Sequence, residues 1–135
     1  MITIGLLACA IVGTIAEARH QGLSSGRSPS SLARSNRFPP VGSCEVTRVK
    51  LIANRNDITR DGTVMTFTNG LVQISYDIVP QIFRSRPGDK VTNCVVSLPQ
   101  NCPPGDTRGI YYRTRNWRTG EHWTLPDSQH ECGGA

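Results

Sequence analysis

The sequence is poor in aromatic residues, in lysine and in helical periodicity. Phe, Trp and Tyr make up 6% of its 135 residues, and only two of its 15 basic residues are lysines. No window repeats apolar residues at helical spacing over three turns, and no apolar run reaches the ~20 residues that span a bilayer. These absences exclude a coiled coil and a polytopic membrane protein, and the length argues against a multidomain enzyme.

The motifs of common catalytic and metal sites are missing as well. The chain has no phosphate-binding or dinucleotide-binding glycine pattern and no G-x-S-x-G nucleophile elbow. Its cysteines form no closely spaced metal knuckle, and the spacing of His122 and His130 lacks the geometry of a helical metal site. We therefore expect neither a metal nor a cofactor.

The first 18 residues differ in composition from the rest of the chain. They contain 13 of its 50 apolar residues and a single charged side chain, Glu17. The apolar run ends in A-x-A, which is typical of a secretory signal peptide. We expect residues 1–18 to be a signal peptide cut before Arg19. A buried core segment, or a lipoprotein signal at residues 6–9 behind an upstream start codon, are the alternatives. The mature protein would be secreted or periplasmic, without a transmembrane segment.

The cysteines fit export. Without the leader an even number remains, namely Cys44, Cys94, Cys102 and Cys132. In a small exported domain this predicts two disulfides, with three connectivities open. Pairing the first with the second and the third with the fourth would close loops of about 50 and about 30 residues. Each bridge would stabilise the fold by ~2–4 kcal/mol, mainly by restricting the unfolded chain.

Residues 19–43 have the composition of a disordered linker. They hold seven Ser, three Pro and four Arg with no acid, and so they would bury too little apolar surface to offset the entropy of ordering. We expect the compact domain at residues 44–135, where 11 basic residues face nine acidic ones. Most of the net positive charge therefore lies in the linker, and the basic isoelectric point is weak evidence for nucleic-acid binding.

The clearest local element is a hairpin in which residues 63–68 and 71–79 flank an Asn-Gly pair. Asn-Gly between two alternating runs favours a two-residue type I′ turn. This turn would pair Met65 with Ile74 on an apolar face and would place Gln73 on the opposite face.

Further strands are expected along the rest of the domain. They cover residues 45–53, 91–98, 109–117 and 122–125, and a short helix fits residues 79–84. The sequence therefore predicts an all-β domain, a small antiparallel barrel or sandwich of five to six strands stapled by two disulfides.

The main candidate surface is the segment 107–120, which holds four Arg, two Tyr and a Trp with no acid. Guanidinium groups pair with carboxylates and phosphates, and aromatic rings stack on planar or sugar ligands. In an exported protein this favours an anionic polysaccharide, a lipid head group or an acidic protein partner over nucleic acid. The predicted ligand-binding residues are Tyr111, Arg113, Arg115, Trp117 and Arg118. The alternative is that arginine merely covers a solvated sheet.

A second hypothesis concerns His122. The segment 119–123, with Arg108 and Arg113 upstream, resembles the last strand of small secreted microbial ribonucleases. The resemblance implies His122 as general acid and the two arginines as phosphate ligands, with the carboxylate base not accounted for. In size, export and cystines the chain is similar to periplasmic lysozyme-inhibitor β-barrels. We predict a binding or inhibitor module, with a ribonuclease-like hydrolase as the alternative.

Overall fold

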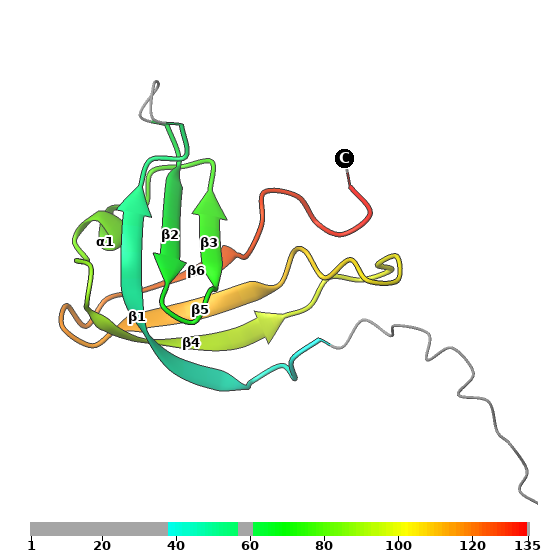
Figure 1. Cartoon of the computed structure of the whole chain (residues 1–135), viewed down its shortest axis with the longest axis horizontal. Helices are drawn as coiled ribbons and strands as arrows, with labels where there is room; N and C mark the ends of the chain where they lie inside the picture. Colours follow the sequence, from blue (N-terminus) through cyan, green and yellow to red (C-terminus); the bar gives the residue numbers. More distant parts are fainter. Residues whose placement is uncertain (1–37, 57–60, 135) are drawn as a thin grey trace, which may run out of the picture. The chain divides into compact units, whose positions relative to one another are not determined.

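The computed structural model describes residues 38–56 and 61–134. The expected signal peptide and nearly all of the expected linker lie outside these residues. The elements are β1 (Cys44–Ala53), β2 (Thr63–Phe67), β3 (Val72–Ser75), α1 (Pro80–Phe83), β4 (Lys90–Ser97), β5 (Tyr111–Asn116) and β6 (His122–Pro126). The six strands form one antiparallel sheet in the order β3-β2-β1-β4-β5-β6, curled into a half-barrel (Figure 1). The predicted all-β class is confirmed.

Strand β1 belongs to both halves of the sheet. Its first part pairs with β4, and its second part pairs with β2. Where the second part begins, its register with β2 shifts between Val49 and Leu51, and such a bulge bends a strand. The bend turns β2 and β3 across the direction of β4, β5 and β6 (Figure 1). The two halves thereby enclose the core on one concave face.

The β2–β3 hairpin forms where it was predicted, but its register differs by one residue. Met65 pairs with Gln73 instead of Ile74, because the loop has three residues, with the Phe67 N–H donating to the Leu71 carbonyl at 2.9 Å. Within the loop only Gly70 has a positive φ, 89°. The predicted type I′ turn is therefore wrong, and the longer loop turns Gln73 into the core beside Met65.

The core joins an apolar cluster to a buried polar group. The cluster consists of Val49, Met65, Phe67, Ile82, Val91 and Trp123. Gln73 lies fully buried on β3, and its Nε2 donates to the carbonyls of Tyr112 at 2.9 Å and Leu125 at 3.3 Å. Its Oε1 accepts from Thr114 Oγ1 at 2.8 Å and from Trp123 Nε1 at 2.9 Å. One satisfied amide thus ties β3 to β5 and β6 across the concave face.

Two disulfides, Cys44–Cys94 and Cys102–Cys132, staple the fold. The first joins directly paired residues of β1 and β4, and the second joins the β4–β5 connection to the C-terminal segment. Of the three connectivities left open by the sequence, the structure has the one that pairs neighbouring cysteines along the chain. Such bridges are consistent with an oxidising, extracytoplasmic compartment. In the part of the chain that the structure describes, no helix is long and apolar enough to cross a membrane.

Candidate functional site

The outer face of β4, β5 and β6 carries the predicted arginines in rows across the sheet. Arg113 lies between Cys94 of β4 and Thr124 of β6, and Arg115 lies between Thr92 and His122. Residues two apart on a strand share a face. Both arginines are therefore exposed, whereas the intervening Thr114 is fully buried.

These rows form one cleft of about 540 Å³, which we call the outer cleft. Its lining residues are Thr92, Cys94, Arg113, Arg115, Trp117, Gly120 and His122. The volume lies within the range of ~300–1,000 Å³ that is usual for ligand sites. No carboxylate occurs among these lining residues, so the electrostatic character of the outer cleft comes from its cations.

Trp117 is both exposed and held in place. The residue is 54% exposed, and its Nε1 donates a hydrogen bond of 2.9 Å to Thr92 Oγ1. The Lys90 ammonium and the Arg115 guanidinium lie 5.5 Å and 5.2 Å from the ring centre, within the reach of cation–π attraction. The indole is thus presented to solvent in one orientation, with two cations beside it.

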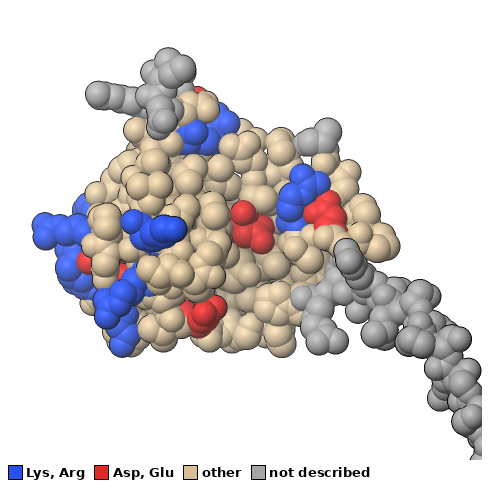
Figure 2. All heavy atoms as spheres, in the orientation of Figure 1, with Lys and Arg blue, Asp and Glu red and all other residues tan. Residues whose placement is uncertain are grey.

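Neither Arg113 nor Arg115 forms an ion pair with any residue that the structure describes. Of the nearby acids, Glu121 accepts a 2.8 Å hydrogen bond from Arg84 Nε instead, which lowers the pKa of this carboxyl. Figure 2 shows most of the visible basic side chains gathered where α1 and the β5–β6 connection lie. The cleft cations therefore have their charge available for a ligand.

Arg118, also predicted in the binding surface, is engaged within the protein. Its Nε and Nη2 contact the two Asp89 carboxylate oxygens at 2.6 Å and 2.8 Å, and Nη2 also donates to the Arg84 carbonyl. This guanidinium, together with a 2.8 Å hydrogen bond from Asn116 Nδ2, holds the pKa of Asp89 well below its usual range. Arg118 joins the β5–β6 turn to the segment before β4.

Tyr111 lies apart from the outer cleft. It lines a cavity of about 310 Å³ that also includes Ile74 and Tyr76 near β3 and Leu125 on β6. The β4–β5 register shifts at this end of the ladder, between Val95 and Ser97. The shift adds a residue to β4, whereas the β5–β6 register runs unbroken from Arg115 to Tyr111. Tyr111 therefore keeps the alternation of β5 and lies beyond the outer cleft, at the other end of the strand.

The residues of the hydrolase hypothesis are divided between two places. His122 and Arg113 both line the outer cleft. Arg108 instead contacts Asp106 through Nε and Nη2, at 2.9 Å and 2.8 Å, and also donates to the Gly134 carbonyl at 3.3 Å. General acid–base hydrolysis requires a base within reach of the same substrate as the acid, and the described lining of the cleft offers none besides His122.

Lys90 and Thr92 were missed by the sequence analysis. Both lie on β4, about 25 residues before Trp117 in the chain, and only the antiparallel pairing of β4 with β5 brings them beside it. The alternation of Thr92 with buried Val91 and Asn93 was the available signal for an outward side chain. It did not indicate which strand would lie next to β4.

Comparison of the chain with protein-family models, with curated proteins and with solved structures finds no match. Among the described residues, no group of three His, Cys, Asp or Glu side chains is arranged to hold a metal ion.

Proposed function

We propose that the protein is an exported binding module whose outer cleft takes an anionic polysaccharide. The observation that carries this proposal is the pair of unpaired guanidinium groups, Arg113 and Arg115, beside the fixed and exposed ring of Trp117. Guanidinium groups pair with carboxylate or sulfate groups, and an indole face stacks on a sugar ring. The indole would thus contact the sugar ring while the neighbouring guanidinium groups bind its acidic substituents.

The spacing of the groups supports a glycan over single-stranded nucleic acid and over an isolated lipid head group. Alternate residues on one strand lie about 7 Å apart, so the two arginines can contact charges on neighbouring sugars. Single-stranded nucleic acid is usually held by several stacked aromatic side chains, whereas Trp117 is the single aromatic residue among the described lining of the cleft. An isolated lipid head group would contact only one of the two arginines and would leave the rest of the outer cleft unoccupied.

The test is calorimetric titration of the oxidised protein with an alginate oligosaccharide, which carries one carboxylate per sugar, and with an uncharged glucan oligosaccharide of equal length. Alginate should bind and the uncharged glucan should not. Arg113→Ala/Arg115→Ala should weaken alginate binding by about 5- to 30-fold, because each exposed ion pair contributes about 0.5–1 kcal/mol.

The matched control is Lys50→Ala/Arg86→Ala, which removes the same charge outside the outer cleft. Equal weakening by both double variants would mean attraction to net charge alone and would overturn the site. Anionic vesicles and single-stranded RNA serve as competing probes. Either of them binding more tightly than alginate, with the same dependence on Arg113 and Arg115, would replace the glycan by that ligand class.

Export itself is tested by the mass of the protein recovered from the medium or periplasm of an expressing cell. Cleavage before Arg19 with two intact cystines is expected. A full-length mass in the cytosolic fraction would contradict export.

A further inference from the structure

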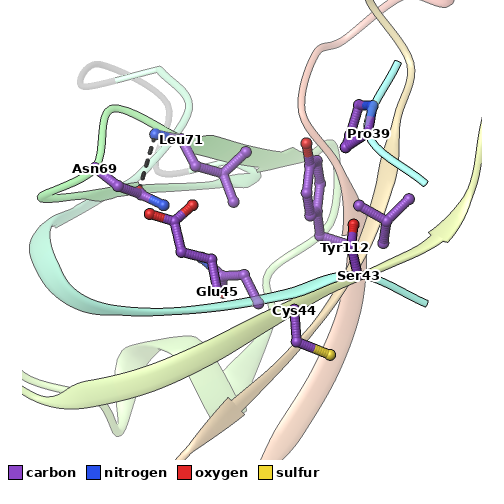
Figure 3. Close-up of a pocket in the computed structure, with 9 residues that line it drawn as sticks. Pro39, Ser43, Cys44, Glu45, Asn69, Leu71 and Tyr112 are labelled. Carbon is purple, nitrogen blue, oxygen red and sulfur yellow. Dashed lines mark hydrogen bonds between the residues drawn. The ribbon is translucent and has the colours of Figure 1, made fainter. Parts of the chain in front are cut away.

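A second cavity, of about 460 Å³, lies on the concave side of the same sheet, and we call it the inner cavity (Figure 3). Its lining residues are Pro39, Ser43, Cys44, Glu45, Asn69, Leu71, Asn93, Val95 and Tyr112. Glu45 pairs with Asn93, and Asn93 pairs with Thr114. These residues alternate with those of the outer face, so the inner cavity and the outer cleft are separate.

The inner cavity contains a buried polar group that the protein leaves unsatisfied. Asn93 is 3% exposed, and its Nδ2 has no hydrogen-bond partner among the described residues. The other end of the amide lies 2.7 Å from Thr114 Oγ1. In either orientation of the amide, the described residues leave one of its two polar atoms without a partner. Buried polar atoms in native proteins are nearly always paired, so an unpaired amide atom in the wall of this cavity is unusual.

The remaining polar groups of the cavity point to a cationic ligand. Glu45 is its single charged residue among the described lining, and it forms no ion pair there. Figure 3 shows its carboxylate directed toward Asn69 and Leu71, with the Tyr112 ring beside this space. Burial, and then the charges of Asp127 and Glu45, raise the pKa of Tyr112, so its hydroxyl stays neutral and can donate.

The apolar lining sets the shape of the ligand. Leu71, Val95 and the ring of Tyr112 offer contact area for an apolar or planar body, and such area with a few polar groups is the usual make-up of a small-molecule site. We propose that the inner cavity binds a small organic amine, with its ammonium group on Glu45 and its apolar body against Tyr112 and Leu71. This inference does not depend on the proposed glycan site.

The experiment is a heteronuclear NMR titration of the isotope-labelled, oxidised protein with three probes of one shape. Tyramine carries an ammonium group, 4-ethylphenol carries no charge, and 3-(4-hydroxyphenyl)propionate carries a carboxylate. Tyramine should shift the backbone resonances of Asn69, Leu71 and Asn93, and the propionate should not. The uncharged phenol should bind more weakly than tyramine.

Variants at Glu45 test whether its carboxylate binds the ammonium group of the ligand. Because Glu45 is exposed, Glu45→Gln should weaken tyramine binding by about 2- to 5-fold, as expected for the loss of one exposed ion pair. Glu45→Lys should reverse the preference, so that the propionate binds and tyramine does not. Asp77→Asn, which removes an exposed carboxylate outside this cavity, and Arg113→Ala/Arg115→Ala should leave the tyramine affinity unchanged.

The two-dimensional spectrum of each variant reports whether it is folded. Failure of alginate to bind would overturn the outer site and leave this one standing. The absence of tyramine-induced shifts in the wild type would overturn the inner site. Equal affinity for all three probes, or equal effects of Glu45→Gln and Asp77→Asn, would do the same.

Discussion

Replacement of Gln73 tests how much its buried hydrogen bonds stabilise the core. Its side chain is fully buried and takes part in four hydrogen bonds with groups of β5 and β6. Gln73→Leu keeps a side chain of similar volume and removes every one of these bonds. The outcome therefore isolates the polar contribution from the packing contribution.

The cost can be worked out from what each partner loses. Trp123 Nε1 is left as a buried donor without an acceptor, which costs about 1–3 kcal/mol. The Thr114 hydroxyl can still turn to Asn93, 2.7 Å away. The carbonyls of Tyr112 and Leu125 belong to residues that pair with each other in the β5–β6 ladder. The expected loss of unfolding free energy is therefore about 1–3 kcal/mol, nearly all of it from the tryptophan.

Urea unfolding followed by the tryptophan fluorescence or circular dichroism of the oxidised protein measures this loss. The control Gln129→Leu replaces an exposed glutamine and should change the free energy of unfolding by no more than about 0.5 kcal/mol. The double variant Gln73→Leu/Trp123→Phe removes donor and acceptor together. It should be less destabilised than the sum of the single variants, with a coupling of about 1–2 kcal/mol.

Two results would refute this reasoning. If Gln73→Leu were as stable as the Gln129→Leu control, the buried amide would not hold β3 against β5 and β6. If the single effects were additive, the hydrogen bond between Gln73 and Trp123 would not be the source of the loss.

Three further predictions concern charge, cystines and chemistry. Because Arg118 lowers the folded pKa of Asp89 below its unfolded value, the resulting stability is present above pH ~4 and is lost as the pH falls further. Asp89→Asn should show a flatter acid limb in chemical unfolding, and an unchanged limb would contradict this. Cys44→Ser/Cys94→Ser opens a loop of 50 residues and should lower the unfolding free energy by ~4 kcal/mol in urea titrations, whereas a loss below ~1 kcal/mol would show residual order in the open chain. Purified wild-type protein and His122→Ala should both leave RNA intact in a gel assay. Turnover that disappears with His122→Ala would instead establish the hydrolase.

The sequence predicted the elements well because their signals are local. Alternation, short apolar runs and turn residues together marked the six strands, and alternation along residues 109–117 placed Arg113, Arg115 and Trp117 on one face, which is exposed. The even number of cysteines in residues 44–135 predicted two bridges, and both are present. The short helix was expected at residues 79–84 and is found at Pro80–Phe83.

Local sequence patterns did not predict which residues lie around the candidate site. Lys90 and Thr92 lie beside Trp117 because β4 pairs with β5. That pairing joins residues far apart in the sequence, so local patterns do not predict it. Arg118 belonged to the same basic segment as the cleft arginines, yet its guanidinium binds Asp89, 29 residues away. A cluster of like charges in sequence indicates a basic surface without showing which members already have a partner.

The sequence by itself determined the β class, the approximate strands and the number of bridges, since each depends on neighbouring residues or on simple counting. Only the tertiary structure decided which face of β3 enters the core. An Asn-Gly pair suits a two-residue loop and also suits a three-residue loop with Gly70 at its positive φ. A shift of one residue in register turns every side chain of a strand to the other face. In the observed register Gln73 forms hydrogen bonds with buried groups of β5 and β6. In the predicted register its side chain would lie on the opposite face of β3, and these groups would lose that partner.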